Sequence, residues 1–408
     1  MRAEFPGRRQ TAEDEPAREP RGRRILLVAG EASGDRHAAG LVREAHKLDA
    51  SLAFEGVGGS ALERAGTRLL HEAKNISVVG IVEVFERLPA IWRVYRDMKR
   101  RLREDPPAAL LLVDFPDFNL RLAAAAARIG VPVVYFISPQ VWAWRSGRVN
   151  TIRRLVDKMI VLFPFEEEFY RRHGVPVVCA GHPLAEVRGR SETVESARRR
   201  LGLDPAGPVF GLLPGSRDGE VRRHFPPLVE TARRVAEEVA GAAFVVPVAD
   251  TVEPRLVNEP LEDLELPVLP VHNDFETAVS ACDAAVVASG TATLELAALD
   301  VPHVVVYRVS RMTHLVGALA VRVGQVSLVN LIAGRTVVPE LLQSHFTPER
   351  AAAELIKVGR PGSDRDRMLE GLAEMRSRLG PPGAYGRAAR ALIEALDAAP
   401  GQRRESAP

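Results

Sequence analysis

The chain has 408 residues, enough for two or three domains, and its 46% hydrophobic content supports large buried cores. Its 55 Lys and Arg residues nearly balance its 53 Asp and Glu residues, which argues against a bulk nucleic-acid binder. The two cysteines, Cys179 and Cys282, exclude a disulfide framework and a cysteine-rich metal site, and they fit a reducing cytoplasm. No apolar run approaches the roughly 18 residues that a membrane-spanning helix needs.

The first 23 residues are rich in Arg, Glu and Pro and contain no long apolar segment. A signal peptide requires such a segment, so residues 1–23 are expected to form a disordered leader.

The first half of the chain then alternates apolar strands with helices. A strand at 25–29 leads into a turn at 30–35 and a helix that runs to about Leu48. In the turn, Glu31 and Ser33 are candidate ligands of an acceptor substrate, although Ser33 alone would also suit a helix N-cap. Further strands are expected at 53–57, 109–113, 133–137, 159–162 and 177–180. This alternation predicts a doubly wound parallel sheet.

A basic amphipathic helix is expected over residues 88–102. Its predicted apolar face consists of Leu88, Ile91, Trp92, Tyr95, Met98 and Leu102. Basic residues line the rest, namely Arg93, Arg96, Lys99, Arg100, Arg101 and Arg103. Together with the apolar stretch 78–82 and the nearby Trp142 and Trp144, this pattern is typical of a membrane-surface segment. The alternative is an ordinary surface helix packed on the sheet.

Carboxylates follow the strand expected at 109–113, in the sequence DFPDFN. Asp114 comes directly after the strand and is the candidate general base. Asp117 and Asn119 lie on the acceptor side too, but we expect at least one of them only to cap the helix that follows.

The strand pattern restarts after a helical, arginine-rich segment at 185–203. Strands are expected at 209–213, 243–248, 268–271, 284–288 and 303–306, followed from Pro348 by three helices that end near Ala399. The predicted organisation is a leader at 1–23, an N-terminal Rossmann-like domain at 24–185, a C-terminal Rossmann-like domain at 186–345 and C-terminal helices within 346–408. Those helices would pack on the N-terminal domain or on a partner subunit, before a disordered tail.

Two turns rich in small residues predict a nucleotide site in the second half. They are VFGLLPGSR at 209–217 and ASGTATLE at 288–295, and each joins a strand to a helix N-terminus, where unpaired N–H groups attract phosphate. The candidate ligands in these turns are Gly215, Ser216, Arg217, Ser289, Gly290, Thr291, Thr293 and Glu295. Arg217 would pair with a diphosphate and Glu295 with ribose hydroxyls. Neither turn is a P-loop or a dinucleotide fingerprint, and the simpler alternative is an ordinary α/β connection.

Residues with metal-ligand spacing do not cluster in the sequence, so neither a metal nor another cofactor is expected. His182 follows the strand at 177–180, near the expected junction of the two domains. A lone histidine is more often structural than a ligand.

Nine motifs resemble the lipid-A-disaccharide synthase family in order and spacing. They are AGEASGD (29–35), VGIVEV (79–84), DFPDFN (114–119), SPQVWAWR (138–145), LFPFE (162–166), GHPL (181–184), LLPGSR (212–217), ASGTATLE (288–295) and VSLVNLIAGR (326–335). The resemblance covers residues 24–399. The chain departs from the family pattern at residues 222–224, which are more basic, and at Val329, where several members have proline.

The resemblance implies an α/β fold of GT-B type, in which two Rossmann-like domains face a cleft. It implies an inverting enzyme that transfers 2,3-diacylglucosamine from its UDP derivative to 2,3-diacylglucosamine 1-phosphate, giving a β-1′,6-linked disaccharide and UDP. Asp114 takes the position of the family's essential aspartate, and Asn330 matches a position near the donor. Trp142 lies in the SPQVWAWR motif on the acceptor side.

Two alternatives remain at this point. One is another GT-B enzyme that uses a UDP-sugar, such as a 2-epimerase or a muramyl-type transferase. The other is a non-catalytic, membrane-surface nucleotide-binding protein, which would not need Asp114. The expected partners are the two acyl-sugar substrates, an anionic membrane surface at the inner face of a Gram-negative inner membrane, and a second subunit in a homodimer.

Overall fold

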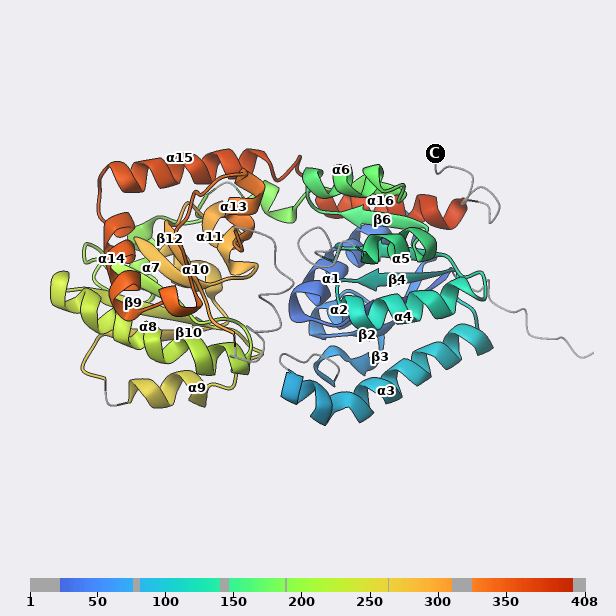
Figure 1. Ribbon diagram of the computed structural model, residues 1–408, viewed down its shortest axis with the longest axis horizontal. Coiled ribbons are helices and arrows are strands. Elements are labelled where there is room, and N and C mark those ends of the chain that lie inside the picture. The colour runs from blue at the N-terminus through green and yellow to red at the C-terminus, as the bar shows by residue number, and fades with distance from the viewer. Residues whose placement is uncertain are drawn as a thin grey trace, which may run out of the picture.

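The structure is a computed structural model that describes residues 23–75, 81–139, 147–187, 189–262, 264–309 and 325–398. Its two halves lie side by side, each built on a parallel sheet with helices on both faces (Figure 1). Both Trp142 and Trp144 lie outside the described residues, as do residues 78–80 of the apolar stretch.

The first described sheet has the strand order β3-β2-β1-β4-β5-β6-β7. Its strands are β1 (Arg24–Ala29), β2 (Ala53–Gly58), β3 (Arg68–Glu72), β4 (Ala109–Val113), β5 (Val133–Phe136), β6 (Lys158–Val161) and β7 (Val177–Cys179). Strands β1 and β4 pair in parallel at the centre, and all five residues of β4 are buried. Helices cover both faces of such strands, which explains why their sequences are continuous apolar runs.

The second described sheet has the order β10-β9-β8-β11-β12-β13. Its strands are β8 (Val209–Leu213), β9 (Ala243–Val248), β10 (Val268–His272), β11 (Ala284–Ala288), β12 (His303–Tyr307) and β13 (Glu340–Leu342). In both sheets the strand order reverses beside a central strand. Ligands of open α/β sheets bind at that point, beyond the carboxyl ends of the strands.

The helices of the first half are α1 (Ala32–Leu48), α2 (Ser60–Arg64), α3 (Ile81–Glu104), α4 (Pro116–Ala127), α5 (Arg148–Leu155) and α6 (Pro164–Arg172). Those of the second half are α7 (Val194–Arg200), α8 (Asp218–Glu238), α9 (Arg255–Asn258), α10 (Phe275–Ser280), α11 (Ala292–Ala298) and α13 (Leu328–Ala333). Short 3-10 helices are η1 (Ala73–Asn75), η2 (Pro183–Glu186), η3 (Glu259–Leu261) and η4 (Gln343–His345).

The C-terminal helices divide between the two halves. Helices α14 (Pro348–Gly359) and α15 (Ser363–Ser377) pack on the second half, against α8 and against α11 and α13 respectively. Helix α16 (Ala384–Asp397) crosses back and packs against α1 and β6 of the first half (Figure 1). Tyr385 of α16 lies where any side chain at Gly40 of α1 would be, since a Cβ there would come 2.6 Å from its ring. The chain therefore passes between the two halves a second time, between α15 and α16.

Three sequence predictions about the elements were wrong. The edge strands β3 and β13 were not expected. The predicted helix over 185–203 is present only as the end of η2 and as α7. Along α3, the buried stripe is Val94, Met98 and Leu102, whereas Leu88 and Trp92 of the predicted apolar face are 44% and 53% exposed.

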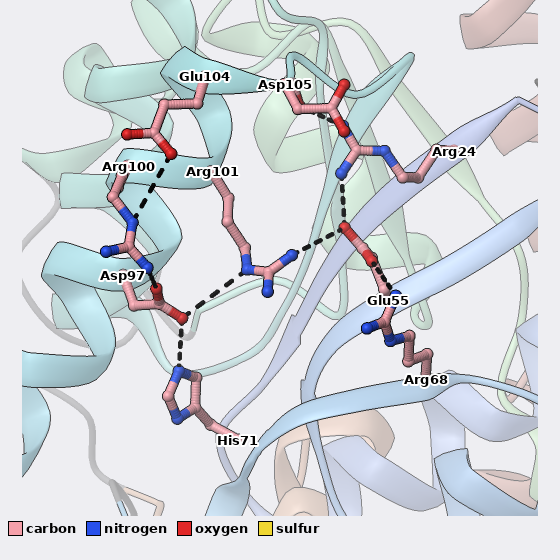
Figure 2. A network of polar contacts seen from close by, with 9 residues as sticks. All are labelled: Arg24, Glu55, Arg68, His71, Asp97, Arg100, Arg101, Glu104 and Asp105. Atoms are coloured by element: carbon pink, nitrogen blue, oxygen red, sulfur yellow. Dashed lines mark hydrogen bonds and ion pairs between the residues drawn. The ribbon is translucent and has the colours of Figure 1, made fainter.

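A chain of ion pairs fastens α3 to the edge of the first sheet (Figure 2). The buried Glu55 of β2 accepts a hydrogen bond from Arg24 at 2.6 Å and lies 3.7 Å from Arg101 of α3. Arg101 also lies 3.8 Å from Asp97, whose carboxylate is hydrogen-bonded to His71 of β3 at 2.8 Å. Arg101, whose side chain is 34% exposed, is therefore paired with two carboxylates, which partly offset its charge within the protein.

Candidate active site

Asp114 occupies a strained turn at the carboxyl end of β4. Asp114 and Phe115 have φ of 47° and 48°, the left-handed region that side chains larger than glycine rarely adopt. The Asp114 carbonyl accepts hydrogen bonds from Asn119 Nδ2 and from the Tyr135 hydroxyl, both at 2.6 Å. Such strain persists where surrounding contacts over-determine it, and it is common at functional sites.

The acceptor-side residues of α4 do not act as expected from the sequence. Helix α4 begins without any side-chain cap, so the capping role predicted for Asp117 or Asn119 is wrong. Asn119 is fully buried and bonds back to the strand end, at Val113 as well as Asp114. Asp117 is exposed and pairs with Arg148 at 2.5 Å. Asn119 therefore shapes the turn that presents Asp114.

The environment of Asp114 suits a general base. Burial, together with the nearby Glu31 carboxylate, raises the pKa of its carboxyl to about 7, while the Phe115 N–H and the Arg217 guanidinium act in the opposite direction. A base works best when its pKa lies near the working pH. At neutral pH a substantial fraction of Asp114 is ionised and able to accept a proton.

Arg217 reaches across from the second half to the first. Its guanidinium donates to Glu31 at 2.5 Å and to Glu220 of α8 at 3.2 Å. Glu220 also accepts from the Ser216 N–H at 3.1 Å, and the loop can wrap around this carboxylate because Gly215 has a φ of 123° and no side chain. Sequence reasoning gave Glu220 no role, although its spacing after Arg217 matches the family pattern.

In the turn after β11, one threonine side chain is bonded within the protein and another faces a cavity. The Thr293 hydroxyl donates to the Gly290 carbonyl at 2.8 Å and is buried within the turn. Thr291 faces a cavity between the halves. Burial raises the pKa of Glu295, against the effect of Arg36 of the first half, which lies 4.0 Å away.

Asn330 lies in α13 with its side chain enclosed. Its Oδ1 accepts from the N–H groups of Val337 and Val338, and its Nδ2 donates to the Val338 carbonyl and to Glu340. Glu340 in turn accepts from the N–H groups of Val326 and Ser327. The Asn330 amide therefore joins the start of α13 to the segment before β13, and Glu340 is a second residue that sequence reasoning missed.

A cavity of about 250 Å³ lies between the two halves. The first half lines it with Ser33, Gly34, His37, Asp114, Ile137, Ser138, Leu162, Phe163, Glu166 and His182, and the second half with Thr291, Leu294 and Leu328. It brings together Ser33, Asp114 and Thr291, which the sequence predicted from three separate motifs. Polar groups on an otherwise apolar wall are typical of a small-molecule site.

Within the described ranges, no group of three His, Cys, Asp or Glu side chains is placed to hold a metal ion. Nor does any helix there have the length and apolar character needed to cross a membrane.

The sequence comparisons identify relatives of this chain. The family model for lipid-A-disaccharide synthetases matches residues 25–368. The chain belongs to the lipid-A-disaccharide synthase family. It is 49% identical to the lipid-A-disaccharide synthase of Myxococcus xanthus over 373 residues, which cover 91% of this chain and 97% of the relative. It is 42% identical to that of Geobacter metallireducens, with 92% and 97% covered.

Solved structures of low sequence identity share the fold. CalG4, the calicheamicin glycosyltransferase, aligns with a TM-score of 0.56 at 15% identity, covering 95% of this chain and 100% of that one. The predicted GT-B fold is therefore confirmed, as is the family resemblance. The chain is a glycosyltransferase of lipid A disaccharide formation.

Proposed function

We propose that the chain transfers 2,3-diacylglucosamine from its UDP derivative to the 6-hydroxyl of 2,3-diacylglucosamine 1-phosphate. The observation that carries this proposal is the half-buried Asp114 carboxyl, whose pKa of about 7 suits a base, in the wall of a cavity that both halves line. Family membership supplies the substrate classes.

In the proposed reaction, Asp114 takes the proton from the acceptor hydroxyl as its oxygen attacks C1 of the donor sugar. The bond from C1 to the UDP oxygen breaks on the opposite face, so an α-linked donor gives a β-linked product. UDP leaves with its electron pair, and the Arg217 guanidinium stabilises the negative charge on its phosphates. Asp114 then releases its proton to solvent.

The proposed substrate contacts are those that the motifs and the family resemblance indicate, apart from three fully buried residues. On the donor side we assign Gly215, Ser216, Arg217, Ser289, Gly290, Thr291 and Glu295, and on the acceptor side Glu31, Ser33, Asp117 and Trp142. We infer that Asn119, Thr293 and Asn330 act by shaping the site, since their side chains bond protein groups. The proposed domain limits remain 24–185 and 186–345, with α16 joined to the first domain.

Mass spectrometry of the products tests the function and separates the alternatives. Incubation with UDP-diacylglucosamine and acceptor is expected to yield the disaccharide 1-phosphate and UDP. A 2-epimerase would change the UDP-sugar without acceptor, and a non-catalytic nucleotide binder would change neither substrate. Either of those results would contradict the proposed transfer.

Replacing Glu31 with glutamine is expected to move the acid limb of the kcat/KM profile to lower pH. The Glu31 carboxylate raises the pKa of Asp114, so without its charge Asp114 stays ionised at lower pH. Replacing Arg217 with glutamine should move the limb to higher pH, because the guanidinium lowers that pKa. Rates measured between pH 5 and 9 check both directions. The control is Glu63→Gln, at an exposed position of α2, and a limb unmoved by Glu31→Gln would contradict this arrangement.

We further propose that the protein binds the cytoplasmic face of the inner membrane through α3. This helix runs along the outer edge of the first half (Figure 1), where Trp92 and Leu88 are exposed beside the exposed Arg93 and Arg96. Both proposed substrates carry acyl chains, and moving a chain into water costs about 0.8 kcal/mol per methylene. Access from the bilayer removes that cost. The homodimer expected from the sequence stays a prediction.

Replacing Arg93, Arg96 and Lys99 with glutamate is expected to lower the partition coefficient of the protein onto anionic liposomes roughly 100-fold. Each basic residue near an anionic surface contributes about 1 kcal/mol, and salt screens this contribution. Co-sedimentation with anionic vesicles at low and high salt measures it. The matched control places glutamate at three exposed basic positions of the second half, Arg199, Lys357 and Arg367. Equal loss in both variants, or binding unaffected by salt, would contradict a role for α3.

A further inference from the structure

His182 has a defined tautomer. It lies between β7 and η2, and its Nδ1 accepts a hydrogen bond from the Leu184 N–H at 3.2 Å. A nitrogen that accepts cannot carry the ring proton, so in the neutral imidazole the proton is on Nε2. The side chain is almost fully enclosed, with 3% of the residue exposed.

Neighbouring groups also hold the imidazole ring in place. The ring stacks on Phe163, with centroids 5.3 Å apart and planes 13° from parallel, and His37 meets it edge-on at 5.8 Å. The His182 N–H donates to the Leu379 carbonyl at 2.8 Å, and Arg387 of α16 donates to the Ala180 carbonyl at the same distance. The segment that returns to the first half thus fixes this loop, and the direction of the Nε2–H bond with it.

The ring stays neutral at physiological pH. Burial lowers the pKa of His182 to about 3, and the neighbouring His37 acts in the same direction. A neutral imidazole offers a hydrogen-bond donor without a positive charge.

Two other polar groups in the cavity wall are engaged by the protein itself. The Ser138 hydroxyl is engaged with Tyr170 at 2.7 Å, and His37 Nδ1 with the Tyr385 hydroxyl at 3.0 Å. No group of the described residues accepts a hydrogen bond from His182 Nε2, although His182 lines the cavity that contains Asp114. An acceptor on a molecule bound in the cavity would complete the hydrogen bonding of this donor.

The walls around His182 indicate which acceptor it fits. Apolar side chains of Ile137, Leu162, Phe163, Leu294 and Leu328 share the cavity. A phosphate would meet no cation among the lining residues that the structure describes and would face the carboxyl groups of Asp114 and Glu166. A carbonyl that carries an apolar chain matches both the neutral donor and the apolar wall.

We propose that the Nε2–H of His182 donates a hydrogen bond to an acyl carbonyl oxygen of the acylated sugar, at the C2 amide or the C3 ester, and so selects acylated substrates. This assignment rests on the proposed function, because it requires an acyl-sugar in this cavity.

Two variants and two substrate analogues test the assignment. His182→Asn retains an acceptor for the Leu184 N–H, and His182→Phe retains the stack on Phe163, but both lack the Nε2 donor. Each is expected to lower kcat/KM about tenfold with the natural acylated pair, the effect of one neutral hydrogen bond. One analogue carries an ether in place of the C3 ester, and the other an amine in place of the C2 amide.

Wild type should lose about tenfold in kcat/KM with whichever analogue lacks the carbonyl that His182 contacts. The His182 variants should have the same kcat/KM with that analogue as with the natural substrate. Thermal unfolding and UDP calorimetry of each variant establish that the fold and donor site persist, and if one variant fails to fold the other supplies the comparison. Equal losses by wild type and variants with both analogues would overturn the His182 assignment while leaving the function intact. Absence of disaccharide from wild-type enzyme and natural substrates would instead overturn the proposed function, and this assignment with it.

Discussion

Replacing Asp114 with asparagine is expected to lower glycosyl transfer by about 10²–10⁴-fold, the usual cost of losing a general base. Asparagine is the appropriate substitution because it has the same shape and tolerates the left-handed backbone found at this position, whereas alanine would add strain. The amide cannot accept the proton of the attacking hydroxyl at neutral pH. Steady-state rates with the acylated substrates measure the loss.

Measuring UDP affinity distinguishes loss of the general base from damage to the whole binding site. Calorimetry should give the same UDP affinity for the Asp114 variant and wild type, because Arg217 and the two turns of the second half are unchanged. The matched control is Asp105→Asn, at an exposed aspartate of the same half that pairs with Arg24. Near wild-type turnover in the Asp114 variant, or an equal loss in the Asp105 variant, would refute the assignment of the base.

The central strands could be predicted from sequence because burial on both faces imposes a continuous apolar run. Strands β4, β8, β9 and β11 begin and end at the predicted residues. The missed strands β3 and β13 are short, lie at sheet edges and have no fully buried residue. Such edges need only partial burial, so their sequences contain charged and polar residues and lack the apolar run that indicates a strand.

The site was predictable where a residue's position in the chain determines its place in the fold. Asp114 at a strand end and Thr291 in a turn both line the cavity. The ion pair of Arg217 with Glu31 joins residues 186 positions apart and depends on how the two halves face each other. No local pattern encodes that orientation.

Residue type alone could not separate ligands from supports. Asn330 was a candidate because it matches a family position near the donor, and Asn119 because it follows a strand end, but the side chain of each bonds backbone groups of the fold. Glu220 and Glu340 were missed because their carboxylates bond backbone N–H groups, and residue type alone does not reveal that role.

Replacing Arg217 with methionine is expected to weaken UDP binding by roughly 10- to 150-fold. A hydrogen bond to a charged group contributes about 1.5–3 kcal/mol, and each 1.4 kcal/mol corresponds to a factor of ten in affinity. Methionine keeps much of the length of the arginine side chain and removes the charge. Calorimetry with UDP measures the change directly.

The ion pair between Arg217 and Glu31 allows a second prediction about UDP affinity. The Arg217 guanidinium is bonded to two carboxylates, and a diphosphate must compete with them. Glu31→Gln removes one competitor, so it should bind UDP at least as tightly as wild type, while the exposed neighbour Arg222→Met should leave the affinity unchanged. Unchanged affinity in Arg217→Met would place the diphosphate away from this loop. Weaker binding in Glu31→Gln would mean that Glu31 holds Arg217 in its working position, and that the contact between the halves assists the donor instead of opposing it.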